Sequence, residues 1–261
     1  MNPHRAVARA VLALLSTWAA AHALAAQVAA PGADLSGIWS LPATNDDPVD
    51  RTGFVESEWS KERLPLTPAG RAALDANRPG RGPRAARPDR INDTQYGANP
   101  NGLYRTLQYA RPFEIGVLPG KIVQLFGWGL AWRAIHTDGR PVPDDVPAGP
   151  FWFGYSVGHW EGDTLVVTTQ ALDDRAWLDE WGTPFSVDAR VVERWRRVAP
   201  DTLQLTITVN DPAYYTRPWT SPPILYKLQK KGVEPVEVIF APIDVNVFEE
   251  TLRKPAIPPA Q

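Results

Sequence analysis

Apolar and polar residues alternate along much of the second half of the chain. In residues 202–210 the odd-numbered positions from Leu203 to Val209 are apolar and the positions between them are polar. A period of two is typical of a β-strand with one buried face. Similar runs, separated by turns such as Pro119–Gly120, predict further strands. The predicted strands cover residues 113–118, 121–126, 130–137, 153–160, 164–169, 187–198, 202–210, 224–229 and 236–239.

Helical signals are few. Thr67 and Pro68 have the residue types of a helix N-cap and first helical position, and they predict a short helix ending near Asn77. A turn at 34–36 leads into Gly37-x-Trp39, an arrangement often found at the mouth of lipocalin-type barrels. Closely spaced strands indicate an antiparallel sheet that closes on itself or packs on a second one. We expect an all-β, lipocalin-like antiparallel barrel with a short N-terminal helix.

The first 26 residues have the three parts of an export signal. Arg5 and Arg9 give the positive start, Val11 to Ala21 the apolar middle, and Ala23–Ala25 the small-residue cleavage site. We therefore expect a periplasmic or secreted protein without a transmembrane segment. The expected organisation is a signal peptide at 1–26, a strand, helix and loop leader at 27–110, the barrel at 111–253 and a Pro-rich tail at 254–261.

Composition excludes some classes of function. The chain has no Cys, and its net charge is −2, or −4 once Arg5 and Arg9 are removed (27 − 2 = 25 basic against 29 acidic side chains). Such a charge gives no nucleic-acid footprint. The chain has 11 Trp residues, some of which we expect in the core because Trp buries a large area. An excess of Trp suits a pocket for flat apolar ligands, so we expect a small aromatic or hydrophobic molecule as partner and leave a homodimer open.

Residues 78–90 carry Arg at every third position. In a polyproline helix, which repeats every three residues, these Arg side chains would share one edge. Such a strip would bind anions, for example lipid headgroups or a partner protein. The Pro and Gly content favours the alternative, a solvated flexible loop.

Four residues are candidates for acid–base chemistry. His159 has an ordinary pKa near neutrality, and the alternation of residues 153–160 puts it on one strand face with Tyr155. Tyr214 and Arg217 lie in a segment rich in Tyr, Trp and Pro, where Tyr214 would donate a proton and Arg217 would stabilise an oxyanion. The alternatives are a surface His on a hairpin and a loop pinned by Arg217.

Other aromatic and charged residues are candidates for binding the ligand. Glu193 and Arg197 share a face of the strand at 187–198, as a pocket ion pair would, although charge on both faces is also typical of a protected edge strand. The remaining candidates are aromatic residues and one arginine, namely Trp128, Trp132, Trp195, Trp219, Tyr104 and Arg105.

Motifs for metals, nucleotides and hydrolysis do not occur. After the signal only His136 and His159 remain, with no Cys, whereas a structural metal site takes three or four closely spaced ligands. A phosphate loop and a Gly-x-Ser-x-Gly elbow are also missing. We expect no metal and no cofactor.

Several motifs together resemble a family of secreted bacterial proteins that are mostly uncharacterised. They are Gly158-x-Trp160-Glu161-Gly162-Asp163-Thr164-Leu165-Val166-Val167, Arg190-Val191-Val192-Glu193-Arg194, residues 206–212 and Tyr215-Thr216-Arg217-Pro218-Trp219-Thr220. The resemblance covers roughly residues 100–220 and implies export and a lipocalin-like β fold. It also implies that the family has His at the positions of Tyr155 and Phe185, so His159 would stand in for one of them.

Two functions follow as hypotheses. The first is a cofactor-free lyase or isomerase that acts by acid–base chemistry on an aromatic or polycyclic molecule in a Trp- and Tyr-lined barrel pocket. The second is a carrier that binds hydrophobic molecules in the same pocket and leaves them unchanged. A third role, surface interaction through the Arg residues of 78–90, would not use the pocket.

Overall fold

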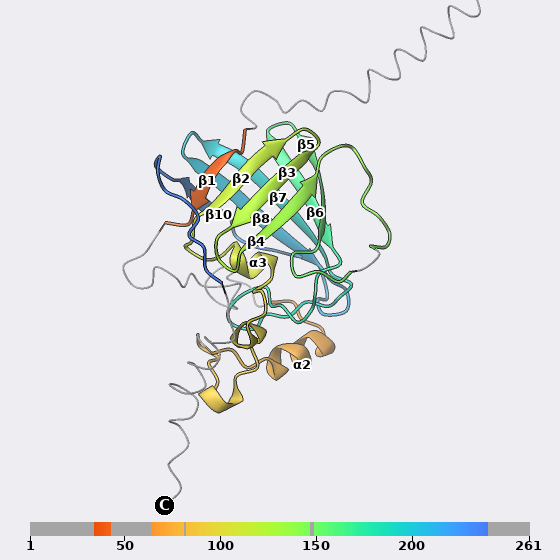
Figure 1. Cartoon of the computed structure of the whole chain (residues 1–261). Coiled ribbons are helices and arrows are strands. Elements are labelled where there is room, and N and C mark those ends of the chain that lie inside the picture. The colour runs from red at the N-terminus through yellow and green to blue at the C-terminus, as the bar shows by residue number, and fades with distance from the viewer. Residues whose placement is uncertain (1–33, 43–63, 81, 147–148, 240–261) are drawn as a thin grey trace, which may run out of the picture.

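A computed structural model of the chain describes residues 34–42, 64–80, 82–146 and 149–239. Ten strands in this part form one sheet, and the pairing of the last strand with β8 closes nine of them into a barrel (Figure 1). The expected all-β barrel is confirmed. The strands are β1 (Gly37–Ser40), β2 (Phe113–Leu118), β3 (Lys121–Phe126), β4 (Ala131–His136), β5 (Tyr155–Glu161), β6 (Thr164–Gln170), β7 (Arg190–Ala199), β8 (Thr202–Asn210), β9 (Trp219–Thr220) and β10 (Ile224–Leu228).

One pair of neighbouring strands runs parallel, which the sequence did not indicate. β4 pairs with β5 through Ile135 opposite Ser156 and His136 opposite Val157, whereas the other ladders are antiparallel. The connection between these two strands is the long segment 137–154, most of which the structure describes, and not a tight hairpin. The barrel is therefore mixed, with a single parallel junction among the described strands.

On β8 the inward face is the one that the alternation predicts. Leu203, Leu205, Ile207 and Val209 are fully buried, while the residues between them are partly exposed. Strand 236–239 is shorter than expected, since its described pairing is one bridge from Val238 to Trp128.

Aromatic rings fill much of the barrel interior. Phe113 packs at 5.2–6.3 Å between ring centroids against Phe126, Trp195 and Tyr226, and Trp195 stacks on Tyr226 at 5.9 Å. Offset and edge-on arrangements of this kind add to the stability that burial of the rings provides. The inside of the barrel is thus a packed core, and the open Trp- and Tyr-lined pocket expected there is not found among these residues.

A charged pair lies in the middle of this core. The guanidinium of Arg133 on β4 donates to both carboxylate oxygens of Glu193 on β7, at 2.9 and 2.6 Å, and both residues are at most 3% exposed. Tyr104, Thr169 and Trp195 also donate to Glu193, at 2.8–3.1 Å. Five hydrogen bonds on one carboxylate replace the water that it loses on folding.

The charge of Arg133 decides the ionisation of Glu193. Burial acts to raise the pKa of Glu193, but the charge and hydrogen bonds of Arg133, with the hydrogen bonds of Trp195 and Tyr104, outweigh it, so the pKa lies below its ordinary value. Glu193 therefore stays ionised in the folded protein at neutral pH.

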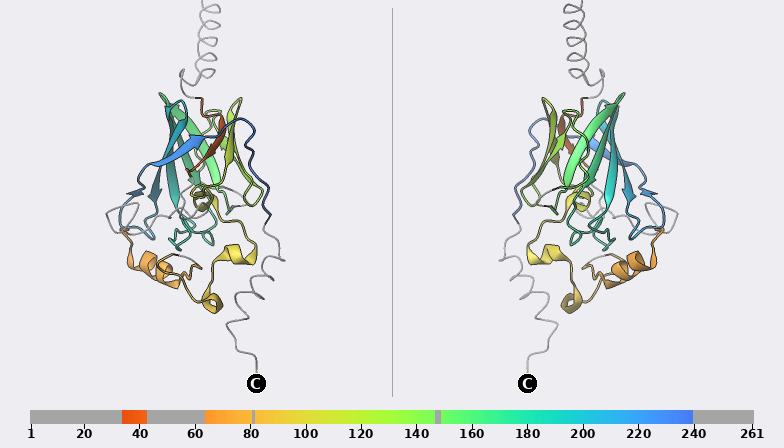
Figure 2. Two further views of the ribbon diagram at one scale, coloured as in Figure 1. Left: turned by 90° about the vertical axis from the view of Figure 1, so that its left-hand side faces the viewer. Right: turned by 90° about the vertical axis from the view of Figure 1, so that its right-hand side faces the viewer.

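One end of the barrel is covered by the helical segments and by the loop 171–189 (Figures 1 and 2). Gln108 donates to the Leu178 carbonyl at 2.6 Å within this layer. Tyr226 donates from β10 to the Leu107 carbonyl at 2.8 Å, which fastens the layer to the barrel. The helices are α2 (Pro68–Ala76), η1 (Pro88–Arg90), η2 (Thr94–Gly97) and α3 (Leu103–Thr106).

The predicted N-terminus of α2 is confirmed. The Thr67 side chain accepts a hydrogen bond from the Gly70 amide at 3.0 Å, and Pro68 occupies the first helical position. Gly70 is required there, because a Cβ atom would lie 2.2 Å from the Tyr214 carbonyl oxygen.

The Arg residues of 78–90 do not share one edge. Arg84 turns inward and donates to the carbonyl oxygens of Leu74 and Trp181, which caps the end of α2. Arg87 and Arg90 are exposed around Asp89, and Arg81 lies outside the described residues. The chain turns within this segment instead of forming one polyproline helix. Arg residues at every third position therefore do not point to the same side.

The predicted signal peptide at 1–26 and the tail at 254–261 lie outside the described residues. Within the described part, the structure contains no helix long and apolar enough to cross a membrane.

Replacement of Arg133 by Met tests the buried pair. The substitution leaves the Glu193 carboxylate buried without its counter-charge, so we expect the free energy of unfolding to fall by about 3–5 kcal/mol in urea denaturation. Arg194→Met is the matched control, because Arg194 pairs with Glu161 at the surface and should change stability little. Equal effects of the two substitutions would contradict the role assigned to the pair.

Candidate functional site

Tyr155 and His159 face away from the barrel interior. On β5, Ser156 bonds to Thr169 inside the barrel and Gly158 faces Ile135, so the alternate residues point outward. The side chain of His159 is 52% exposed and lies 3.3 Å from Glu161, and Tyr155 accepts a hydrogen bond from Arg140. The expectation that these two side chains line a barrel pocket is wrong, because the parity of β5 puts its small residues inside.

Tyr214 and Arg217 lie on a different part of the molecule. The Tyr214 carbonyl accepts a hydrogen bond from the Thr67 amide at 2.9 Å, beside the start of α2, and Arg217 is exposed on the same loop. The loop is pinned by Asp211, which accepts hydrogen bonds from Ser186 at 2.7 and 2.8 Å. The four candidates for acid–base chemistry therefore do not share a pocket.

The candidates for ligand binding separate into three groups. Tyr104, Glu193 and Trp195 meet inside the barrel, where they belong to the packed core. Trp132 is 64% exposed on the outer face of β4, and Trp219 is buried on β9. Arg105 and Trp128 line one cavity together and are the part of the set that the structure gathers at a site.

The ion pair expected between Glu193 and Arg197 does not form. Glu193 pairs with Arg133 instead, while the Arg197 guanidinium lies 5.3 Å over the Trp39 ring and donates to the Pro200 carbonyl. The register of β7 brings Arg197 to the barrel rim, where backbone carbonyls and an aromatic face are within reach.

The cavity that holds Arg105 and Trp128 lies at the covered end of the barrel. Its volume is about 150 Å³, and segments far apart in the sequence supply its walls. Aromatic rings and charged groups face each other across it. The lining residues are Gly80, Asp93, Gln95, Tyr96, Arg105, Tyr109, Trp128 and Glu180. We call it the end cavity.

Charged groups converge on Arg105 in the end cavity. Its Nη1 lies 2.9 Å from both carboxylate oxygens of Asp93, its Nη2 lies 3.7 Å from Glu180 Oε1, and its Nε donates to the Tyr109 hydroxyl at 2.7 Å. The Arg105, Asp93 and Glu180 side chains are each at most 9% exposed. One guanidinium thus pairs with two buried carboxylates and donates a hydrogen bond to a phenol hydroxyl.

These neighbours determine the ionisation of Tyr109 and Arg105. Burial raises the pKa of the Tyr109 hydroxyl well above its ordinary value; the charge of Arg105 opposes this, and the charge and hydrogen bond of Glu180 add to it. Burial acts to lower the pKa of Arg105, but Tyr109 and Asp93 outweigh it and hold the pKa above its ordinary value. At neutral pH Tyr109 is a proton donor and Arg105 a fixed cation.

The position of Arg105 is set by the residue before it. On α3, Tyr104 reaches into the barrel to Glu193 while Arg105 reaches outward to Asp93. Gly102 begins this helix at φ 81°, and a Cβ atom there would lie 2.6 Å from Ala176. The short helix therefore links the packed core to the end cavity and fixes the guanidinium between the carboxylates.

Asp179 fixes the position of Glu180. Its Oδ1 accepts hydrogen bonds from the amides of Trp181 and Thr183 at 2.8 and 3.0 Å, and its Oδ2 accepts one from the Thr183 hydroxyl. Burial raises the pKa of Asp179 above its ordinary value, in spite of the hydrogen bonds from Thr183 and Trp181. The turn 179–183 is thus closed by a fully buried carboxyl group.

Sequence reasoning missed Asp93, Tyr109 and Glu180. Nothing in their local pattern marks them, since they lie in loops without periodicity and meet only when the barrel end is covered. The alternation of β4 could have predicted a buried partner for Arg133. Arg133 shares the inward face of its strand with Ala131 and Ile135, where an unpaired charge is not tolerated.

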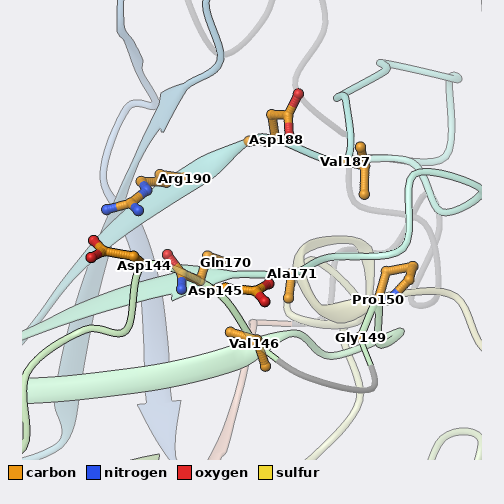
Figure 3. Close-up of a pocket in the computed structure, with 11 residues that line it drawn as sticks. Asp144, Asp145, Val146, Gly149, Pro150, Gln170, Ala171, Val187, Asp188 and Arg190 are labelled. Atoms are coloured by element: carbon orange, nitrogen blue, oxygen red, sulfur yellow. The ribbon is translucent and has the colours of Figure 1, made fainter.

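A second cavity, of about 280 Å³, lies where residues 144–146 and 149–150 pass the ends of β6 and β7 (Figure 3). Charged side chains prevail in its wall, with Asp144, Asp145, Asp188 and Arg190 around Gln170. None of the described residues that line it is aromatic. We call it the side cavity.

Among the described residues, no three His, Asp or Glu side chains lie close enough together to hold a metal ion. Comparison of the chain with protein-family models, with curated proteins and with solved structures finds no match.

Replacement of Asp179 by Asn tests the closed turn. Because its folded-state pKa is raised, Asp179 contributes stability at pH values below its ordinary 3.8, and that contribution is lost as pH rises through the folded pKa. Asn can accept the same two backbone hydrogen bonds and carries no charge. We expect the stability of the variant relative to the wild type to increase as pH rises from 3 to 7, measured by urea denaturation. A constant difference would contradict the assignment.

Proposed function

We propose that the protein is an exported, cofactor-free lyase or isomerase that acts by acid–base chemistry on a single-ring aromatic molecule bound in the end cavity. The observation that carries the proposal is the meeting of Arg105, Asp93, Glu180 and Tyr109 in a buried cavity with aromatic walls. Buried ionisable groups with shifted pKa values in a concave site are typical of active sites.

The aromatic walls support an aromatic substrate. Trp128 lies edge-on to Tyr109, with ring centroids 5.7 Å apart, and the Arg111 guanidinium lies 4.8 Å over the Trp128 ring. A cavity of about 150 Å³ can hold one benzene-sized ring. Its size favours single-ring compounds over the polycyclic compounds that the sequence also suggested.

Each charged group has a distinct role in the proposed reaction. Glu180 removes a proton from the substrate, and Tyr109 donates one from its un-ionised hydroxyl. Arg105 stabilises negative charge that develops on a substrate oxygen, and Asp93 holds Arg105 in place at 2.9 Å. The acid, the base and the oxyanion stabiliser thus lie within one network. His159 and Tyr155, which face away from the barrel interior, do not belong to such a network.

A carrier function is the second candidate, and it uses the same end cavity. A lipocalin-type carrier would hold its ligand inside the barrel. Here the barrel interior is filled by side chains, which favours the end cavity as the binding site. A carrier predicts saturable binding without any chemical change.

Residues 1–26 support the proposal that the protein is exported. Their positive start, apolar middle and small-residue end have the form of a signal peptide. We propose the periplasm or the extracellular medium as its location.

Incubation with a panel of single-ring aromatic compounds tests the enzyme. Chelator-treated protein should convert at least one compound, as followed by mass spectrometry. Glu180→Gln should lower the rate by about 10²–10⁴-fold, the usual contribution of a general base. His159→Ala is the control, because its side chain is exposed outside the barrel, and it should leave the rate unchanged.

Two results would overturn the assignment. A product formed equally well by Glu180→Gln would place the chemistry elsewhere, provided that thermal unfolding shows both variants folded. A compound retained by the protein in equilibrium dialysis but recovered unchanged would establish the carrier.

A further inference from the structure

Three arginine side chains in the described part of the chain lie over the ring of a tryptophan. The pairs are Arg111 with Trp128 and Arg175 with Trp152, both with the arginine Cζ 4.8 Å from the ring centroid, and Arg197 with Trp39 at 5.3 Å. A cation over an aromatic face is a favourable arrangement, but the N–H groups of the guanidinium still need acceptors. The three sites can therefore be compared by what these N–H groups bind.

The protein itself supplies acceptors to two of the three guanidinium groups. Arg175 forms an ion pair with Asp173 at 2.6 Å, and its Nε donates to the same carboxylate at 2.9 Å. Arg197 donates to the backbone carbonyls of Pro200 and Asp34, at 3.1 and 3.0 Å. These two arginines are fixed by a ring and by acceptors together, and their arrangement needs no ligand.

Arg111 differs from both. Among the described residues its guanidinium takes part in no ion pair and no hydrogen bond, and the contact that it makes is with the ring of Trp128. Its Nε is buried and has no acceptor there. Buried donors are normally satisfied, and a charged donor left unpaired is costlier than a neutral one. Arg111 therefore keeps a positive charge that an anion can bind.

The register of β2 and β3 sets the position of Arg111. Phe113 and Phe126 lie opposite each other in this ladder, and both side chains are buried in the barrel. Arg111 and Trp128 lie two positions beyond them along the chain, and the contact between the two side chains shows that they still face each other past the strand ends. Trp128 lines the end cavity, whereas Arg111 lies next to the Trp128 ring without lining the cavity.

The charge inside the end cavity differs from the charge beside it. Arg105 is already paired with Asp93 and Glu180, so the described lining residues carry two negative charges and one positive charge. These carboxylates would repel a ligand group that is already fully negative. Arg111 offers such a group a guanidinium that no described carboxylate engages. A ligand with one aromatic ring and one anionic group therefore fits with its ring in the cavity and its charge on Arg111.

We propose that the ligand of the end cavity is an aromatic carboxylate, whose ring lies in the cavity and whose carboxylate accepts two parallel hydrogen bonds from Arg111. This inference rests on the proposed function, because it takes the end cavity as the place where the ring binds. One ring fills a cavity of about 150 Å³, so the carboxylate extends past Trp128 to reach Arg111. Arg111 thus determines specificity and takes no part in proton transfer.

Isothermal titration calorimetry of the full protein at low salt tests the ligand class. The probes are benzoate, phenylacetate and 3-phenylpropanoate, in which the distance from ring to carboxylate increases, and the three corresponding amides, which have nearly the same shape and no charge. At least one carboxylate should bind with one-to-one stoichiometry and about tenfold or more tightly than its amide, because hydrogen bonds between charged groups are the stronger ones. Added salt should weaken the binding of the carboxylate and not that of the amide.

The substitution Arg111→Gln locates the binding. It should weaken the carboxylate about tenfold or more and leave the amide unchanged, so that the two compounds bind alike. Unchanged binding of the amide would show that the cavity is intact, which the loss of a merely structural residue would not give. Arg111→Lys keeps the charge without the two parallel hydrogen bonds, so it should retain part of the preference, and it serves as the test variant if Arg111→Gln does not fold.

Arg175→Gln is the matched control. Arg175 lies at the same distance over a tryptophan ring, but it is paired with Asp173 and does not line the end cavity. The variant should bind the carboxylate like the wild type.

The inference fails on any of three results. The first is that no carboxylate of the series binds at millimolar concentration, and the second is that each amide binds as tightly as its acid. The third is a preference for the acid that survives in folded Arg111→Gln.

Failure of this inference and failure of the proposed enzyme give different results. Conversion of a neutral aromatic compound at a rate that depends on Glu180, without any preference for acids, would keep the enzyme and reject the carboxylate. A preference for acids that depends on Arg111, without conversion of any compound, would keep the carboxylate and establish the carrier. Where an acid is converted, Arg111→Gln should raise KM and leave kcat unchanged, because the carboxylate is bound equally in the ground state and the transition state.

Discussion

The pairing of Arg133 with Glu193 in the barrel core is the interaction on which the other features depend. A buried carboxylate must be matched by donors, and Glu193 obtains them from β4, β6, β7 and α3 at once. Strand register and the docking of the helical layer are thereby tied to one group. The cost of burying two charges makes such a pair poor as a source of stability but effective as a source of specificity, because misaligned strands would leave it unmatched.

The same interaction explains why a site could form outside the bore. Rings and the ion pair occupy the interior, and the two cavities described above lie where loops close over the end or the side of the barrel. Through Tyr104 the core fixes α3, and the next residue, Arg105, projects into the end cavity. A rigid interior therefore positions a polar cluster that the loops alone would hold loosely.

The fold could be predicted from sequence much better than the site. Alternation gave β2, β3 and β8 with the bounds observed, because one face of each is buried and a period of two is a local property. On β5 the strand was predicted but its inward face was not: the small residues Ser156 and Gly158 lie inside, and the large Tyr155 and His159 outside. The end cavity brings together residues such as Asp93 and Glu180 that are distant in sequence. No local pattern in the sequence predicts that these residues lie close together.

The number of strands in the ring has a topological consequence. Neighbours in a closed ring can all be antiparallel only if their number is even, since every step reverses direction and the last strand must match the first. With nine strands, one junction has to be parallel, and in this chain it is the one between β4 and β5. Hairpins cannot join parallel neighbours, so the chain must return along the outside of the barrel before the next strand begins. That return path brings Asp144 and Asp145 to β6 and β7. The side cavity is thus a consequence of the odd number of strands in the ring.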